Sequence, residues 1–185
     1  SKKVATVPLA HQPGDAWTYS IGMDILGCVI EKASSMSFGN FLKKNIFEPL
    51  QMNDTFFKVP EAKRSRMTNL YAHHNAFKAF SVDIPKELKG KKPKMYLIDS
   101  SRDSLFYKNI TVEDGGSGLV STASDYSNFA QMLLNKGVYE GKRILSATSF
   151  NTLVSNQLNE KNSRFRGFGM GITLGIALDS KKIRL

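Results

Sequence analysis

The segment 13–50 constrains the fold most, because it encodes two helices in close succession. Apolar residues recur at helical spacing over residues 22–34 and form one stripe, which predicts an amphipathic helix there. This stripe consists of Ile25, Leu26, Val29, Ile30 and Ala33. A second, shorter helix is predicted to begin after Ser37, a good N-cap, and to end at Pro49. Its buried face is predicted to consist of Phe38, Phe41, Leu42 and Ile46.

A glycine-rich turn over residues 114–118 precedes a third predicted helix. Thr122 and Asp125 have the spacing of a capping box, so we expect this helix to begin after Thr122. Its predicted apolar face consists of Tyr126, Phe129, Met132 and Leu133, and Gly137 is well placed to end it. Beyond a turn at residues 140–141, Ser146 is predicted to cap a helix that contains Phe150, Leu153 and Val154.

Residues 168–178 alternate strictly between apolar and small residues, which predicts one strand with an apolar face. Residues 55–110 have no clean period and are assigned only as short strands or packed loops, with 86–94 as an exposed connection. Trp17 is predicted to anchor the core. Cys28, the only cysteine, permits no internal disulfide and is predicted to be a buried, inert thiol.

The chain has 185 residues and a formal net charge of +10, which allows one compact domain with a real core. An excess of basic over acidic residues can attract nucleic acid or an acidic polymer. However, the densest basic run, 86–94, contains glycine and proline without interleaved aromatic residues, so a solvated loop is favoured and no nucleic-acid partner is expected. No apolar run is long enough to span a membrane. His73 and His74 are adjacent and point apart, so no metal site and no cofactor are expected.

The order of motifs resembles the penicillin-recognising serine hydrolases, the family of class C β-lactamases, DD-peptidases and related esterases. Residues 13–20 match the first eight positions of that family's Pro-Gly-x-x-Trp-x-Tyr-Ser-Asn-x-Gly turn, with Tyr19 at the tyrosine position, and Ile21 stands in place of the asparagine. Residues 46–55 match its Ile-Phe-x-Pro-Leu-Gly-Met-x-x-Thr segment, and residues 115–137 match its glycine loop and following helix. The resemblance is weak over residues 56–110.

This resemblance implies an α+β fold of the β-lactamase/DD-peptidase type, present only in part. Residues 1–160 would be the helical lobe with the tyrosine motif, and 161–185 the start of the antiparallel sheet. The chain is therefore expected to be a middle segment of a protein about twice as long. Such a segment would expose surface that other parts normally cover, so either dimerisation through that surface or marginal stability is expected.

The resemblance also assigns candidate site residues. Tyr19 would be the catalytic residue that moves protons, and the substrate cleft would include Ile21, Gly115, Gly116 and Ser117. The chain contains no Ser-x-x-Lys, Lys-Thr-Gly or His-x-Gly sequence, so the nucleophile and the substrate-binding strand of the family are not in it. Ser117 is not expected to replace that nucleophile. The chain by itself is therefore predicted to be inactive.

Three functions remain open from the sequence. The first is a fragment of a bacterial serine hydrolase that cleaves a small-molecule or peptide ester, amide or β-lactam through an acyl-enzyme; the resemblance suggests a periplasmic or extracytoplasmic location. The second is a non-catalytic penicillin-binding-protein-like module that binds cell-wall peptide or a protein partner. Ile21 motivates this alternative, because isoleucine cannot make the contacts of the family's asparagine. A polyanion-binding protein is the third and least favoured.

Overall fold

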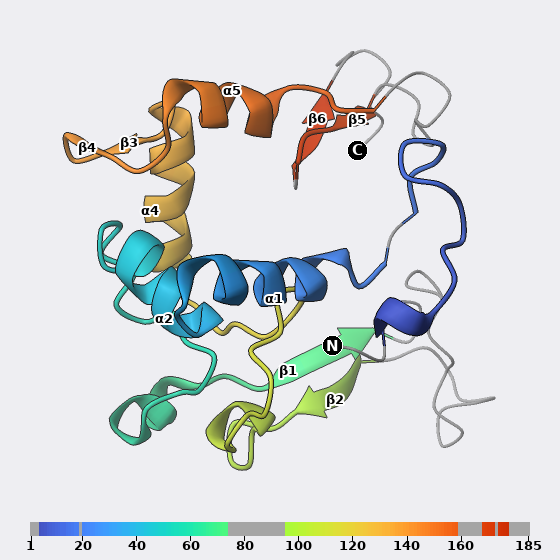
Figure 1. Cartoon of the computed structure of the whole chain (residues 1–185). Coiled ribbons are helices and arrows are strands. Elements are labelled where there is room, and N and C mark those ends of the chain that lie inside the picture. The colour runs from blue at the N-terminus through green and yellow to red at the C-terminus, as the bar shows by residue number, and fades with distance from the viewer. Residues whose placement is uncertain (1–3, 19, 74–94, 159–167, 173, 178–185) are drawn as a thin grey trace. The chain divides into compact units, whose positions relative to one another are not determined.

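The computed structural model describes residues 4–18, 20–73, 95–158, 168–172 and 174–177. The chain divides into two compact units (Figure 1). The first unit comprises residues 1–55 and 113–185, and the second comprises residues 56–112. Helices and short antiparallel strands both occur, so the α+β class predicted from the sequence is confirmed. The proposed division into residues 1–160 and 161–185 stays a prediction.

The first unit begins with a short 3-10 helix, η1 (Val4–Thr6), and the predicted helix α1 (Gly22–Ser34). Helix α2 (Phe38–Leu42) continues into one π-helical turn, η2 (Lys43–Phe47), so the helical backbone ends two residues before Pro49. Ser37 caps α2 as predicted, because its hydroxyl oxygen accepts a hydrogen bond from the Asn40 N–H at 3.2 Å.

The glycine turn leads into α4 (Ala123–Leu134), which Thr122 caps by accepting a hydrogen bond from the Asp125 N–H at 3.1 Å. Strands β3 (Val138–Tyr139) and β4 (Lys142–Arg143) form a small hairpin, and α5 (Ala147–Val154) follows with Ser146 as its cap. Gly137 has a φ of 87° in the turn after α4, as its predicted role requires. Tyr126 is 64% exposed, so its place on the buried face of α4 was wrongly predicted.

The core of the first unit lies between η2, α4 and β3. Leu50 is fully buried and Met132 is 1% exposed, and Phe47, Met52 and Tyr139 complete the buried cluster. Two residues of the predicted second-helix face, Leu42 and Ile46, pack against this cluster while partly buried. Because all of these residues come from the segments 42–52 and 132–139, the core joins two regions that are far apart in the sequence.

A buried carboxylate supports the same junction. Asp125, which is 5% exposed, accepts hydrogen bonds from the Asp54 N–H at 2.7 Å and from the Thr55 hydroxyl at 2.8 Å. The Thr55 hydroxyl also lies 2.7 Å from that of Ser121. Asp125 therefore ties the first turn of α4 to the end of the segment that carries α1 and α2, instead of completing a capping box.

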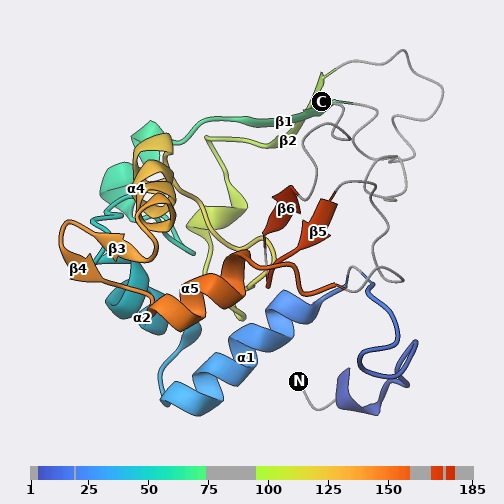
Figure 2. The ribbon, with the colours of Figure 1, turned by 90° about the horizontal axis from the view of Figure 1, so that it is seen from above.

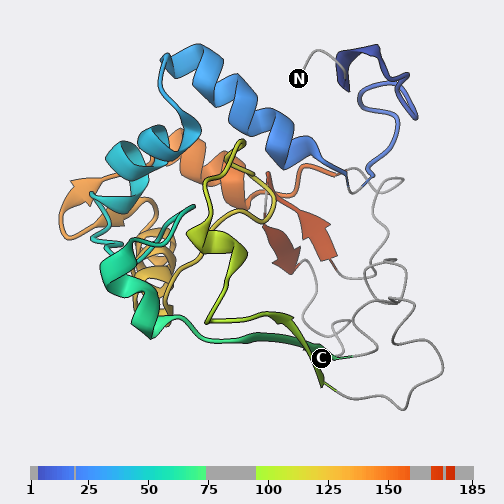
Figure 3. The ribbon, with the colours of Figure 1, turned by 90° about the horizontal axis from the view of Figure 1, so that it is seen from below.

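The predicted single strand at 168–178 is wrong. The chain forms two short strands, β5 (Phe168–Met170) and β6 (Gly175–Ala177), which pair antiparallel (Figures 2 and 3). The Gly171 N–H donates to the Leu174 carbonyl at 2.8 Å between them. Alternation at period two cannot distinguish one strand from a tight hairpin, because both strands keep the same period.

The predicted burial of Cys28 is also wrong, because its thiol is exposed. Helix α1 packs instead through Gly27, whose absent side chain lets the Phe38 ring lie 3.3 Å from the position of a Cβ. The predicted apolar stripe is not the packed face, because Ile25, Leu26 and Val29 are 42%, 42% and 54% exposed.

The second unit contains the 3-10 helices η3 (Glu61–Arg66) and η5 (Leu105–Tyr107) and the antiparallel strands β1 (Leu70–His73) and β2 (Met95–Asp99). Its buried side chains are Phe57, Val59 and Ser104. The Ser104 hydroxyl donates to Asp99 at 2.5 Å, which fixes the start of η5 against the end of β2. The predicted exposed connection at 86–94 and the second histidine of the adjacent pair, His74, fall outside the described residues.

Candidate functional site

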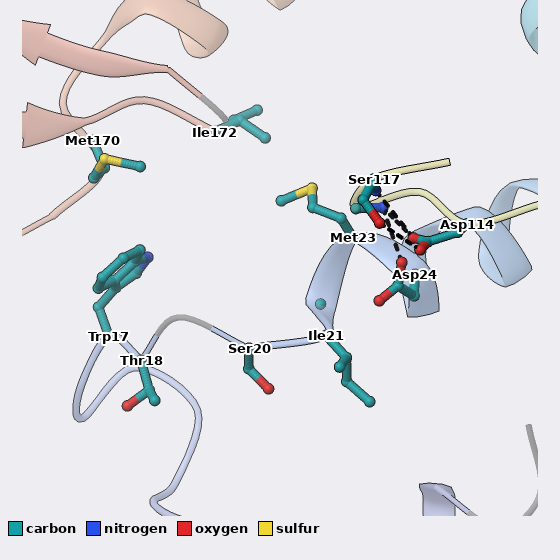
Figure 4. Close-up of a pocket in the computed structure, with 12 residues that line it drawn as sticks. Trp17, Thr18, Ser20, Ile21, Met23, Asp24, Asp114, Ser117, Met170 and Ile172 are labelled. Carbon is teal, nitrogen blue, oxygen red and sulfur yellow. Dashed lines mark hydrogen bonds between the residues drawn. The ribbon is translucent and has the colours of Figure 1, made fainter. Parts of the chain in front are cut away.

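A pocket of about 740 Å³ lies in the first unit, where three segments meet (Figure 4). The turn that contains Trp17, Thr18 and Ser20 forms one wall, and residues 21–24 at the start of α1 continue it. The glycine loop contributes residues 114, 116 and 117, and the β5–β6 hairpin contributes residues 170 and 172. The pocket therefore combines the two sequence segments that carry the predicted site.

The predicted site residues have the following places. Tyr19 lies outside the described residues, whereas Thr18 and Ser20 on either side of it line the pocket. Ile21, Gly116 and Ser117 also line the pocket. Gly115 is not among the lining residues; it lies against the start of α1, since a Cβ at this position would collide with the Met23 carbonyl oxygen. Glycine is thus required at 115 by the close approach of two backbones. The roles of these five residues remain predictions.

Sequence reasoning missed two carboxylates in this pocket. Asp24 comes from the first turn of α1 and Asp114 from the beginning of the glycine loop. The Gly116 N–H lies within hydrogen-bonding distance of both, at 2.9 Å from Asp24 Oδ1 and 2.6 Å from Asp114 Oδ1. The Ser117 hydroxyl donates to Asp114 Oδ2 at 2.8 Å. The two carboxylates therefore hold the glycine loop against the start of α1 (Figure 4).

The two carboxyl groups have opposite pKa shifts. Hydrogen bonds from Asp24, the Gly116 amide and the Ser117 hydroxyl lower the pKa of Asp114 to about 2. The same hydrogen bond to Asp114 is the main cause that raises the pKa of Asp24. Two adjacent carboxyl groups resist ionising together, so as the pH rises Asp114 loses its proton first and Asp24 loses its proton later.

Local signals explain why these residues were overlooked. An acidic residue in the first turn of a helix is common without any further function, because it favours the positive end of the helix dipole. Likewise, aspartate before two glycines is typical of an ordinary turn.

Trp17, predicted as a core anchor, is instead half-buried on the wall of the pocket. Only the fold shows that these side chains share one cavity.

The geometry limits what Ser117 can do. Its hydroxyl already donates to Asp114, whose low pKa makes it a weak general base. The described residues that line the pocket include no lysine or histidine that could activate this hydroxyl. Among the described residues of the pocket, no side chain is therefore placed to activate the Ser117 hydroxyl.

The described residues contain neither a cluster of metal ligands nor a membrane-spanning helix. No group of three or more His, Cys, Asp or Glu side chains among them could hold a metal ion. In this part of the chain, no helix has the length and apolar character to cross a membrane.

Comparisons with known proteins agree with the resemblance of the motifs. The β-lactamase family model matches residues 1–177. Protein Rv1367c of Mycobacterium tuberculosis is 28% identical over 98% of the chain and 43% of its own length. Penicillin-binding protein 4* of Bacillus subtilis is 30% identical over 68% of the chain and 30% of its own length. The chain therefore spans less than half of these relatives.

A solved structure shows the same fold. A mutant of simvastatin synthase from Aspergillus terreus superimposes with a TM-score of 0.70 at 21% identity, over 97% of this chain and 44% of that one. The fold predicted from the sequence, a partial β-lactamase-like fold, is thereby confirmed. Because the family model covers nearly the whole chain, this protein belongs to the β-lactamase family.

Proposed function

We propose that this chain is the tyrosine-bearing part of a serine hydrolase that cleaves an ester, amide or β-lactam through an acyl-enzyme. The pocket between the Trp17–Ser20 turn, the start of α1 and the glycine loop is the observation that carries the proposal. In this family, segments that resemble these border the active site. Relatives of the chain include a protein named lovastatin esterase, which supports hydrolysis of an ester, and one named penicillin-binding protein 4*, which supports recognition of a β-lactam.

Tyr19 would move protons between the nucleophile, the leaving group and an activating lysine. A phenol can take part in general acid–base catalysis when its surroundings hold it in hydrogen-bonding reach of the reacting atoms. The neighbours Thr18 and Ser20 line the pocket, which supports this assignment. The nucleophilic serine would come from a Ser-x-x-Lys segment, and no serine in this chain has a lysine three residues later.

A non-catalytic binding module is the second candidate, and Ile21 favours it. This side chain is 51% exposed and lines the pocket at the position where the family has asparagine. An isoleucine neither donates nor accepts a hydrogen bond, so it cannot orient a substrate amide or a lysine. An ester has no N–H group for an asparagine to accept from, so the loss of this side chain affects ester hydrolysis less than amide hydrolysis, and hydrolysis remains the better proposal.

The test compares Tyr19→Phe with Tyr126→Phe in the complete reading frame that encodes this chain. Tyr126 is 64% exposed and does not line the pocket, so its substitution is a matched control. Hydrolysis of p-nitrophenyl butyrate would be measured for each variant. Since general acid–base catalysis contributes about 10²–10⁴-fold, Tyr19→Phe should lower kcat by about that factor and Tyr126→Phe should leave it unchanged.

Two results would contradict the proposal. Equal activity of the two variants would remove Tyr19 from the mechanism. Covalent labelling of the isolated 185-residue chain by a fluorophosphonate probe would show that the nucleophile lies within it. If the complete protein has no hydrolase activity and yet binds a cell-wall peptide, the binding module becomes the better explanation.

A further inference from the structure

The second unit carries most of the positive charge of the chain. Its 57 residues, 56–112, contain twelve Lys and Arg against five Asp and Glu, which gives a net charge of +7. The other 128 residues contain fourteen Lys and Arg against eleven Asp and Glu, which gives +3. A unit with less than a third of the residues therefore attracts anions more strongly than the rest of the chain.

The β1–β2 hairpin of this unit exposes an apolar face. Tyr71 lies opposite Leu97, and Met95 is on the same face because it is two residues before Leu97 in β2. These three side chains are 49%, 51% and 56% exposed, respectively. On the other face, Ala72 lies opposite Tyr96, and both are half-buried. The described part of the unit therefore packs on one face of the hairpin and leaves the other uncovered.

An arginine lies beside this apolar face. The Asn69 side-chain amide donates to the Tyr71 hydroxyl at 3.1 Å, and Asn69 Oδ1 accepts a hydrogen bond from the Ser101 N–H at 2.8 Å. These bonds hold the turn after β2 against Tyr71. Arg102, the next residue of that turn, is exposed. A positive charge is thus placed at the edge of the apolar face.

The acidic residues of the unit offset little of its charge. The described residues 56–73 and 95–112 contain six Lys and Arg against three Asp and Glu. Asp99 accepts hydrogen bonds from the Ser104 hydroxyl and the Leu105 N–H, and Asp103 lies 3.8 Å from Lys108 Nζ. Two of the three acidic side chains are therefore engaged within the unit, so its outer surface is predominantly basic.

An uncovered apolar face within a basic unit restricts what can bind it. Contiguous apolar surface marks a binding site, and its positive surroundings favour an anionic partner. A second copy of the chain fits poorly, because two units of charge +7 repel one another. An anionic lipid bilayer offers both a negative surface and an apolar interior, and binding to its surface requires no membrane-spanning segment.

We propose that the second unit binds the surface of an anionic lipid bilayer. Tyr71, Met95 and Leu97 enter the boundary between headgroups and acyl chains, and the basic side chains of the unit lie against lipid phosphate groups. Tyrosine suits that depth, because its ring is apolar while its hydroxyl stays hydrated or hydrogen-bonded. This role goes beyond the proposed hydrolysis and does not depend on it.

The test uses the protein encoded by the complete reading frame, because any part of it that covers the hairpin is then in place. Sedimentation measures its binding to sucrose-loaded vesicles of phosphatidylcholine alone and of an equimolar mixture with phosphatidylglycerol. Each Lys or Arg near an anionic surface strengthens binding by about fivefold, so we expect at least about tenfold tighter binding to the mixed vesicles. Added sodium chloride should reduce this difference.

Two variants separate the apolar contribution from the charge. Leu97→Ser should weaken binding to the mixed vesicles by about three- to tenfold, because it removes apolar surface that lipid would bury. Arg102→Gln should weaken it by about fivefold. Leu134→Ser and Lys142→Gln are the matched controls, since both residues are exposed in the first unit, and they should leave binding unchanged.

Several results would overturn the proposal. Binding to neither kind of vesicle, or equal binding to both, would contradict it. Unchanged binding of Leu97→Ser, or equally tight binding to soluble polyglutamate, would show attraction to polyanions without contact with lipid chains. If Leu97→Ser does not fold, as judged by circular dichroism, Met95→Ser on the same face replaces it. Loss of hydrolysis in Tyr19→Phe with unchanged vesicle binding would separate this proposal from the hydrolase proposal.

Discussion

Thr55→Val tests whether the buried carboxylate of Asp125 fixes the fold around α4. The Thr55 side chain is 5% exposed, and its hydroxyl donates to Asp125 Oδ2 at 2.8 Å. Valine has nearly the same shape, so the substitution removes the hydroxyl without opening a cavity. Asp125 would keep the Asp54 N–H as a donor at 2.7 Å, and Ser121 would lose its neighbour at 2.7 Å.

The size of the effect follows from these contacts. A hydrogen bond to a charged group contributes about 1.5–3 kcal/mol to stability. We therefore expect Thr55→Val to lower the free energy of unfolding by about 1.5–3 kcal/mol. For a chain of this size about 1 kcal/mol moves the midpoint of thermal unfolding by about 2–4 °C, so the midpoint should fall by about 3–12 °C.

The assay is thermal and urea-induced unfolding followed by far-ultraviolet circular dichroism. Thr152→Val is the matched control, because Thr152 is exposed and its hydroxyl only donates to the Thr148 carbonyl within α5. Surface substitutions of this kind usually change stability by less than about 0.5 kcal/mol. The reasoning is refuted if Thr55→Val and the control unfold at midpoints within about 1 °C of each other, which is on the order of experimental error. The hydrogen bond from Thr55 to Asp125 would then not stabilise the fold.

Further predictions follow from the pocket and from α1. Gly115→Ala should lower the free energy of unfolding by about 1–3 kcal/mol, because a Cβ would collide with the Met23 carbonyl oxygen. In the same unfolding assay Gly22→Ala should be neutral or stabilising, because the space around Gly22 is open. Carbon-13 NMR should find that Asp114 titrates at about 2 and that Asp24 titrates above 3.8. Because its pKa is lowered, Asp114 contributes stability above pH 3.8 that is lost as the pH falls toward 2, whereas Asp24, with a raised pKa, acts in the opposite sense. The difference in unfolding free energy between wild type and Asp114→Asn should therefore shrink over that pH interval. A difference that stays constant with pH would contradict this linkage. The exposed Cys28 thiol should react with Ellman's reagent in the folded chain at the rate of a free thiol, and slow reaction limited by unfolding would contradict its exposure.

Helix boundaries could be predicted because their causes are local. Ser37, Thr122 and Ser146 each accept a hydrogen bond from the N–H three residues later, and each of these contacts is visible as a sequence pattern. The start and end of α1 were predicted correctly for the same reason, since its apolar spacing is confined to one segment.

The packing of those helices could not be predicted in the same way. The face that α1 buries is set by Gly27 against Phe38, a contact that depends on how the chain turns between α1 and α2. An apolar stripe alone does not say which partner covers it, so Cys28 and Val29 were assigned without knowledge of that partner. The β5–β6 hairpin shows the same limit, because the reversal near Gly171 leaves the alternation of residues unchanged.

The site required still more information from the fold. Asp24 and Asp114 are 90 residues apart in the sequence, and neither has an unusual local environment there. Their role appears only because the glycine loop approaches the first turn of α1 closely enough for Gly116 to bond both. The resemblance to the family identified the glycines, but it did not explain why a side chain is excluded at position 115.

The bond between Asp24 and Gly116 links the two halves of the pocket. Asp24 is on the same helical turn as Ile21, and Gly116 is next to Ser117, so this hydrogen bond and the close packing of Gly115 on the Met23 carbonyl together set the distance between the two walls. A substitution at Asp24 therefore changes both the charge of the pocket and the position of its glycine wall. Asp24→Asn separates these effects from Asp24→Ala, because only asparagine retains an acceptor.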